Sequence, residues 1–225
     1  MDKIIAFSFD DGTVQDERLV ALLKKYGFKA TFNLSSALFG TEYSFEMNGH
    51  HVVHTRLPLE KALALYEGFE VAAHTRTHNC LKLLEPKDII EEVVPDYMRL
   101  SELFGRPVRG LAYAWGGKNY DRLAVEILKN FTTVRYARSA ADGNSLAFPE
   151  NFLAWNPSAH ILSDKLSGLI DEFERAEKGL LFIWGHSFEL DFDDGWNRAE
   201  AVLKRLKNID AENLTCMETC ERLSR

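Results

Sequence analysis

Residues 4–12, Ile4-Ile5-Ala6-Phe7-Ser8-Phe9-Asp10-Asp11-Gly12, form the stretch of sequence that decides the fold. The apolar run 4–9 predicts a short buried strand, and Gly12 gives the backbone the freedom for a sharp turn at its end. Two adjacent carboxylates after a buried strand repel each other unless a positive charge lies beside them. A divalent metal ion is the expected charge, because carboxylates and imidazoles are ordinary ligands for such ions.

The matching histidines follow another predicted strand, residues 69–73. His74 comes at the end of this strand, and His78 follows four positions later. On a helical turn this spacing places two side chains on one side, with Cβ atoms about 5–6 Å apart. Both imidazoles would then reach one ion, at about 2.0–2.1 Å for zinc.

A simpler interpretation is a structural histidine pair, with Asp10 and Asp11 capping the helix that follows them. The predicted position of both features at strand ends favours the metal site, because α/β enzymes place their chemistry at the carboxyl ends of strands. One Asp and two His ligands would leave the remaining metal positions open for water and substrate.

Two segments, Ser8-Phe9-Asp10-Asp11-Gly12 and His74-Thr75-Arg76-Thr77-His78, together resemble the first two motifs of the polysaccharide deacetylase family (carbohydrate esterase family 4, the NodB-homology domain). The resemblance implies that Asp10 is a general base and that Asp11, His74 and His78 bind a divalent metal. Zinc is the expected ion, with cobalt, nickel and iron as alternatives. It also implies an α/β fold, a single distorted (β/α) barrel of about seven parallel strands.

A third segment, Ala112-Tyr113-Ala114-Trp115-Gly116, resembles the Arg-x-Pro-aromatic-Gly motif of the family, with alanines in place of its Arg and Pro. The resemblance implies that the backbone N–H of Trp115 stabilises the oxyanion, and Tyr113 becomes a candidate substrate contact. The Arg that holds the catalytic Asp is missing. Arg109 or Arg138 would substitute for it, and Arg138 is preferred because it follows a predicted strand. The alternative is that both are solvated surface residues.

A fourth segment, Leu180-Leu181-Phe182-Ile183-Trp184-Gly185-His186-Ser187, resembles the Leu-x-x-His motif of the family. The resemblance implies that His186 is the general acid that protonates the leaving amine, and Trp184 is a candidate substrate contact. The alternative is a neutral, hydrogen-bonded core histidine. The family also orients this His with an Asp, for which Asp142 and Asp164 are the candidates.

The segment after His186 offers further candidate substrate contacts. The ring of Trp196 would stack on a sugar, and Glu189 would contact substrate hydroxyls or an amine. Asp193 or Asp194 is better interpreted as the cap of the next helix. His160 is a weaker candidate for a site residue, since histidines in such positions are more often structural.

Predicted strands alternate with predicted helices, which favours a parallel sheet or barrel in one domain, residues 1–225. Thr13 and Asp16 resemble a capping box for the first helix. The helices are expected at 14–26, 58–66, 87–104, 120–129, 164–178 and 194–207, and the strands at 4–9, 29–34, 69–73, 109–113, 132–136, 152–155, 180–185 and 213–217.

The alternation is interrupted at residues 41–55, where Asn48-Gly49 predicts the turn of an inserted β-hairpin. We expect this hairpin to project from the barrel as a lid or an oligomer contact. His50, His51 and His54 suggest a second metal site, but alternating residues of an exposed hairpin are usually solvated.

The composition limits the partners. A net charge of −7 over 225 residues argues against nucleic acid or an anionic membrane surface as the main partner. The sequence enters its first predicted strand directly after Met1-Asp2-Lys3, so no signal peptide is expected. No apolar run approaches the roughly 18 residues of a membrane span. Cys216 and Cys220 are expected to be packed thiols in a reducing compartment. We therefore expect a cytoplasmic protein, with homo-oligomerisation left open.

Together these features predict a metal-dependent hydrolase of non-peptide C–N bonds. The expected reaction is the deacetylation of an N-acetylated amino sugar or small oligosaccharide to acetate and a free amine. Three alternatives remain. One is hydrolysis of a non-sugar C–N bond in a ureide or cyclic amide, and another is a non-catalytic, metal-bearing carbohydrate-binding protein. A purely structural role is the least favoured, because four polar motif elements lie at predicted strand ends.

Overall fold

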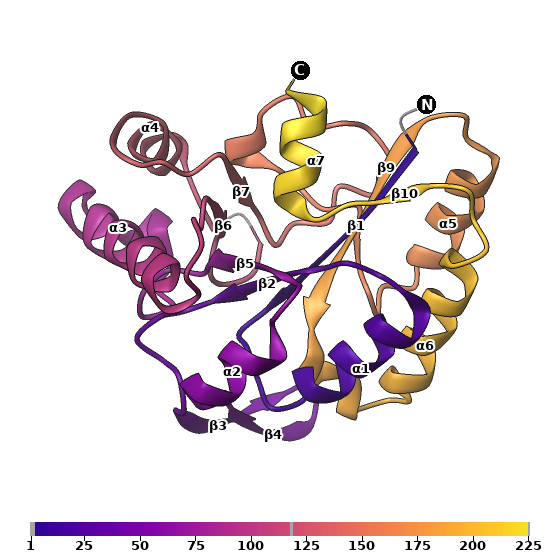
Figure 1. Ribbon diagram of the computed structural model, residues 1–225, viewed down its shortest axis with the longest axis horizontal. Coiled ribbons are helices and arrows are strands. Elements are labelled where there is room, and N and C mark those ends of the chain that lie inside the picture. Colours follow the sequence, from indigo (N-terminus) through magenta and orange to yellow (C-terminus); the bar gives the residue numbers. More distant parts are fainter. Residues whose placement is uncertain (1–2, 118, 225) are drawn as a thin grey trace.

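Strand β1 (Lys3–Asp10) runs through the centre of a curled parallel sheet in the computed structural model, which describes residues 3–117 and 119–224 (Figure 1). Every residue of β1 is buried. The strand order is β7-β6-β5-β2-β1-β9-β8, and the short β10 pairs beside the start of β1. The predicted α/β class and the barrel-like sheet of seven parallel strands are confirmed, with β10 as a short addition.

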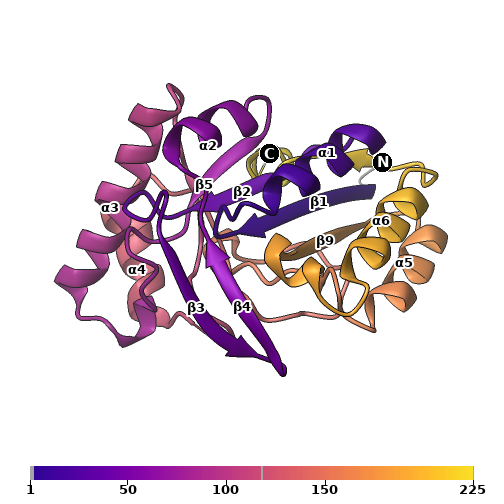
Figure 2. The ribbon, with the colours of Figure 1, turned by 90° about the horizontal axis from the view of Figure 1, so that it is seen from below.

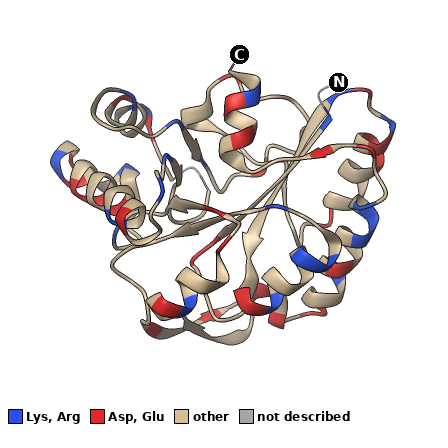
Figure 3. Ribbon diagram, viewed as in Figure 1, with Lys and Arg blue, Asp and Glu red and all other residues tan. Residues whose placement is uncertain are grey.

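Helices surround this sheet in Figure 1, and acidic and basic segments are interspersed along them in Figure 3. Among the described residues, no helix combines the length and the apolar character needed to cross a bilayer. The helices are α1 (Asp16–Tyr26), α2 (Leu59–Leu65), α3 (Pro86–Leu103), α4 (Arg122–Phe131), α5 (Leu166–Arg175), α6 (Gly195–Leu206) and α7 (Cys216–Leu223). The other strands of the sheet are β2 (Thr31–Leu34), β5 (Glu70–Ala73), β6 (Gly110–Ala112), β7 (Tyr136–Arg138), β8 (Ala159–His160), β9 (Gly179–His186) and β10 (Glu212–Asn213).

The register of the sheet positions the polar strand ends. β1 pairs with β9 from Lys3 opposite Gly179 to Asp10 opposite His186. On its other side, Asp10 is paired with Asn33 of β2. Because all these strands are parallel, their carboxyl ends meet at one edge of the sheet, which brings Asp10 and His186 together from positions far apart in the sequence.

The turn after β1 depends on Gly12, as predicted. Its φ is +66°, in the left-handed region that glycine adopts without strain. A Cβ at this position would also lie 2.6 Å from Leu34 Cδ2. The predicted capping box after this turn is wrong, because the Thr13 hydroxyl is hydrogen-bonded to Ser187 Oγ at 2.9 Å and Gln15 is the N-cap residue.

Three predicted strands differ from the structure. Residues 152–155 contain a short 3-10 helix (Phe152–Ala154), and the strand of this region is β8. The segment predicted at 132–136 is paired only from Tyr136, in β7. The strand expected at 213–217 ends at Asn213, because Thr215 and Glu218 form a capping box that begins α7 at Cys216. The Thr-x-x-Glu pattern of residues 215–218 was the available sequence signal for this helix start.

The predicted hairpin is present as β3 (Glu42–Met47) and β4 (His50–Thr55). Asn48 and Gly49 both have positive φ, of 52° and 82°, as a tight two-residue hairpin turn requires. The hairpin extends away from the sheet in Figure 2, as expected. Its second strand, β4, runs back toward the carboxyl ends of β1 and β2, where the Val14 N–H donates to the Thr55 carbonyl at 3.0 Å.

Candidate active site

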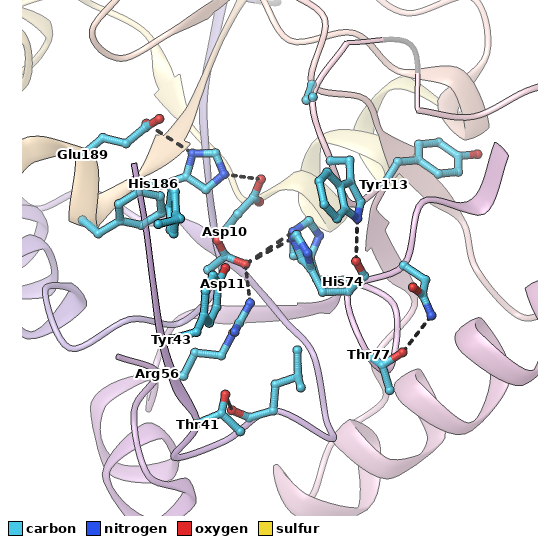
Figure 4. A pocket seen from close by; sticks show the side chains of 18 of the residues that line it. Asp10, Asp11, Thr41, Tyr43, Arg56, His74, Thr77, Tyr113, His186 and Glu189 are labelled. Carbon is cyan, nitrogen blue, oxygen red and sulfur yellow. Dashed lines mark hydrogen bonds and ion pairs between the residues drawn. The ribbon is translucent and has the colours of Figure 1, made fainter. Parts of the chain in front are cut away.

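The carboxyl ends of β1, β5 and β9 and the inner face of the hairpin enclose a cavity of about 750 Å³ (Figure 4). The polar residues that line it include Asp10, Asp11, His74, His78, His186, Glu189 and Arg56. Side chains separated by up to 179 positions in the chain therefore share one pocket.

The predicted metal ligands lie together in this pocket. The Asp11 Oδ1 atom is 3.4 Å from His78 Nε2 and 3.9 Å from His74 Nε2, and the three ligand atoms lie within 4.8 Å of one another. His74 Nδ1 is 2.9 Å from the Ala112 carbonyl, which can only accept a hydrogen bond. The proton of His74 is therefore on Nδ1, and the lone pair of its Nε2 atom faces the ligand atoms of Asp11 and His78. This donor set fits a divalent metal ion.

The loop that carries the two histidines is not the helical turn expected from their spacing. Thr75 and His78 both have left-handed backbone, with φ of 61° and 60°. The Glu92 carboxylate holds the loop by accepting hydrogen bonds from the Thr77 N–H at 2.9 Å and from its hydroxyl at 2.6 Å. A tight loop braced by a buried helix residue therefore brings the imidazoles together.

Asp96 fixes the backbone at His74 by hydrogen bonds. Its two carboxylate oxygens accept hydrogen bonds from the backbone N–H of His74 at 3.1 Å and of Ser36 at 2.7 Å. Asp96 is fully buried. Sequence reasoning missed both Asp96 and Glu92; an acidic residue at a buried position of an amphipathic helix was the available signal.

The local electrostatics suit a metal site. Burial lowers the pKa of His74. The pKa of His78 falls to about 4, because this side chain is removed from water and lies beside the imidazole of His74. Burial opposes ionisation of Asp11, but the hydrogen bond from His54 and the nearby imidazoles outweigh it and hold its pKa well below the usual value. Neutral imidazoles and an ionised carboxylate are the forms that bind a metal.

The candidate base, Asp10, is buried beside the predicted metal ligands. Its Oδ1 atom accepts hydrogen bonds from Asn33 Nδ2 at 2.8 Å and from the Arg138 guanidinium. Burial opposes ionisation of Asp10, but the charge of Arg138 outweighs it and lowers the carboxyl pKa. Asn33 was missed, and its signal was an amide in an otherwise apolar strand.

Arg138 takes the place expected for the missing motif arginine. It is fully buried and also donates from Nε to Ser8 Oγ at 3.1 Å. The interpretation of Arg138 as a solvated surface residue is therefore wrong. Arg109, the other candidate, is exposed and precedes β6, at the opposite end of that strand from the pocket.

The candidate acid, His186, faces Asp10 across the pocket. Its Nε2 atom lies 3.7 Å from Asp10 Oδ2, and its Nδ1 atom lies 3.2 Å from Glu189 Oε2. Glu189, expected only as a substrate contact, thus lines the pocket and orients His186. The two residues expected to orient His186, Asp142 and Asp164, neither line the pocket nor contact this histidine. Asp142 accepts a hydrogen bond from Trp184 Nε1 at 2.7 Å, and Asp164 accepts one from Arg198 at 3.3 Å.

His160 completes this arrangement. Its Nε2 atom is 2.7 Å from the same Glu189 oxygen, while its Nδ1 atom accepts a hydrogen bond from the Leu162 N–H at 3.2 Å. The proton of His160 is therefore on Nε2 and points at Glu189. Burial disfavours a charged His186, but the Glu189 carboxylate, with Asp10 and Asp11, raises its pKa to about 9.

The aromatic candidates divide into two groups. Tyr113, Trp115 and Trp184 line the pocket. The side chain of Trp115 is 61% exposed and donates from Nε1 to the His78 carbonyl at 2.8 Å. Trp196 does not line the pocket and is wrong as a substrate contact. It is buried in α6 in the hydrophobic core, with Nε1 donating to Asp191 at 2.7 Å.

Two residues at the end of the hairpin contact the predicted metal ligand Asp11 directly. His54, expected to be solvated, is fully buried with Nε2 3.0 Å from Asp11 Oδ2. Arg56 donates from Nη2 to Asp11 Oδ1 at 3.1 Å. A carboxylate oxygen has two lone pairs, so this bond leaves Oδ1 one lone pair for a metal. Only the folded hairpin brings these two side chains to the site.

Solved structures share this fold at low sequence identity. A family 4 acetyl xylan esterase from Clostridium thermocellum in complex with a cobalt ion superposes with a TM-score of 0.60 at 15% identity, over 99% of this chain and 92% of its own. For a CE4 family pseudoenzyme from Bacillus anthracis, BA3943, the TM-score is 0.62 at 14% identity, over 97% and 66%. For the Streptococcus pyogenes deacetylase PplD in complex with acetate it is 0.53 at 21% identity, over 67% and 62%.

The match thus spans less than two thirds of the streptococcal and anthrax chains. Among curated proteins, no sequence matched this chain. The family described as polysaccharide deacetylase matches residues 1–134, more than half of the chain and the part that contains Asp10, Asp11, His74 and His78. The chain therefore belongs to the polysaccharide deacetylase family.

Proposed function

We propose that this chain is a metal-dependent deacetylase that hydrolyses the amide of an N-acetylated amino sugar or small oligosaccharide to acetate and a free amine. Asp11, His74 and His78 would hold the ion, with zinc expected. When bound, a divalent ion supplies Lewis-acid polarisation of the acyl carbonyl and acidifies the attacking water.

One observation carries the proposal. The carboxylate of Asp10 and the imidazole of His186 face each other at 3.7 Å beside the three-donor set. The low pKa of Asp10 keeps it ionised at neutral pH, and the pKa of His186, about 9, keeps that residue protonated. A base without its proton and an acid with its proton are the pair that amide hydrolysis requires.

In the proposed reaction, water adds to the amide carbon and Asp10 takes one of its protons. The backbone N–H of Trp115 donates to the oxygen on which negative charge develops. The C–N bond then breaks, and His186 Nε2 gives its proton to the departing nitrogen. Glu189 accepts from His186 Nδ1 throughout and keeps Nε2 directed at the pocket. Acetate carries the oxygen of the water, and the amine leaves with its new proton.

Arg56 favours a second candidate, a non-catalytic carbohydrate-binding protein. Its guanidinium is buried and donates to Asp11 Oδ1, so it neutralises part of the charge that a metal would neutralise. A site balanced in this way would keep its shape without an ion.

Metal content and acetate release distinguish the two candidates. We expect about one zinc, cobalt, nickel or iron per chain, by elemental mass spectrometry after dialysis against metal-free buffer, and acetate release from N-acetylglucosamine or its short oligomers. A protein that takes up none of these ions when each is added back would exclude the hydrolase and leave the binding protein.

A further inference from the structure

The inner face of the β3–β4 hairpin presents an apolar wall to the pocket. We define this wall as Tyr43, Phe45 and Met47, alternate residues of β3 that all line the cavity. Side chains alternate between the two faces of a strand, and the intervening Glu42, Ser44 and Glu46 are exposed. A face directed at solvent alone would not need three large apolar side chains, and Tyr43 remains 44% exposed within the pocket.

The wall is fixed in place from both ends of the hairpin. At its base, Arg56 forms a β-bridge with Thr13, and His54 is buried against Asp11. At its tip, His50 lies 3.2 Å from Asp193 Oδ2 and stacks on Phe192 with ring centroids 4.5 Å apart. The apolar face is thus held over the cavity before any ligand binds.

Phe45 is the part of the wall directed at the acid side of the reaction centre, whereas Tyr43 packs against His54 with ring centroids 4.7 Å apart. Phe45 packs edge-on against Phe188 with ring centroids 6.1 Å apart, and Phe188 lies 5.3 Å from the ring of His186. In the proposed function, which this step takes as its premise, His186 protonates the departing nitrogen. The group nearest Phe45 is therefore the amine portion of the substrate, not its acyl methyl group.

We infer that the substrate carries an apolar substituent on its amine portion, such as an alkyl or aryl aglycone on the N-acetyl amino sugar, and that Phe45 and Met47 bind this substituent. An unsubstituted sugar ring can stack on one aromatic side chain, but it would leave the rest of the wall facing water. An apolar aglycone would remove that surface from water, which is favourable in proportion to the area buried.

The test compares the methyl and hexyl β-glycosides of N-acetylglucosamine on the metal-loaded protein. Calorimetry gives the Kd of each glycoside for the Asp10→Asn variant, in which turnover is suppressed, and acetate release gives kcat/KM for the wild type. We expect the hexyl glycoside to bind at least tenfold more tightly than the methyl glycoside.

Phe45→Ser and Met47→Ser, each combined with Asp10→Asn, should each reduce this preference several-fold. Met47 lies near the hairpin tip and is only half-buried, so its variant serves if Phe45→Ser disturbs the hairpin. Val53→Ser is the matched control, since Val53 lies on the same hairpin, is 47% exposed and does not line the cavity. It should leave the preference unchanged.

Equal Kd values for the two glycosides would overturn the inference whatever the acetate measurement gives, as would a preference that survives both wall variants or no binding of either glycoside. A hexyl preference that depends on the wall, without acetate release by the wild type, would keep the apolar subsite and reject the deacetylase. The failure of the subsite and the failure of the proposed function are thus distinguishable.

Discussion

The metal side and the acid side of the pocket both use histidine, but their surroundings shift its pKa in opposite directions. On the metal side, His78 is half-buried beside another imidazole, and its pKa falls to about 4. On the acid side, His186 is half-buried to the same extent, but the Glu189 carboxylate contacts its Nδ1 atom and its pKa rises to about 9.

The difference teaches that burial alone does not set the state of these residues. Desolvation lowers the pKa of both imidazoles, and the charge of the neighbouring group decides the outcome. The neighbouring His74 imidazole lowers the pKa of His78 further, whereas the Glu189 carboxylate beside Nδ1 raises the pKa of His186. In the proposed function, the first side would bind a metal and the second would release a proton.

The largest expected effect comes from removing a metal-side imidazole. His78→Ala leaves two of the three donors, so we expect both the bound metal and acetate release to fall to background. Elemental mass spectrometry and the acetate assay measure the two quantities on one sample. Full activity without bound metal would exclude a catalytic role for a metal ion held by His78.

The second-largest effect is expected for the candidate base, whose loss should lower kcat without lowering the metal content. Asp10→Asn keeps the shape of the side chain but removes its basicity, so we expect kcat to fall by about 10²–10⁴-fold with metal content unchanged. Near-normal turnover in this variant would exclude Asp10 as the base.

Arg138→Met should move the acidic limb of the pH–rate profile. Arg138 offsets the burial of Asp10, so its loss raises the carboxyl pKa. Because the base works only when ionised, the limb moves to higher pH, and we expect roughly a 10–100-fold loss at neutral pH. Arg138→Lys, which keeps the charge, should restore part of the limb position. Equal profiles for both variants and the wild type would contradict this role.

Glu189→Gln tests the acid side directly. Without the carboxylate the pKa of His186 falls from about 9, so the alkaline limb moves to lower pH. The rate at pH 8 then drops by about tenfold for each unit by which this pKa lies below 8. The exposed Glu172 provides a matched control, since Glu172→Gln removes an acidic group far from the pocket. An unmoved alkaline limb would argue against His186 as the acid.

The smallest effect is expected when the pH is lowered from 7 to 5 and the metal content of the protein is measured. A histidine binds metal only without its proton, and the pKa of His78 is about 4. Metal content should therefore be nearly the same at pH 7 and pH 5 and should fall as the pH drops through 4. Loss of the metal between pH 7 and pH 6 would show that this imidazole has an ordinary pKa.

Local sequence was enough for much of the fold. The apolar run of β1, the Asn48-Gly49 turn and the amphipathic periodicity of α1 each act over a few residues, so they are readable without tertiary information. The strand β8 was missed because two residues leave no periodic signal. The start of α7 was missed although Thr215 and Glu218 form a capping box that is visible in the sequence, because the region was interpreted as a strand at 213–217.

For the site, the sequence by itself determined the candidates whose chemistry lies in short motifs at strand ends: Asp10, Asp11, His74, His78 and His186. Only the tertiary structure decided their partners. Arg138 reaches Asp10, Glu189 and His160 reach His186, and Arg56 and His54 reach Asp11. The physical reason is that parallel register and hairpin docking join residues far apart in the chain, and no local pattern encodes that distance.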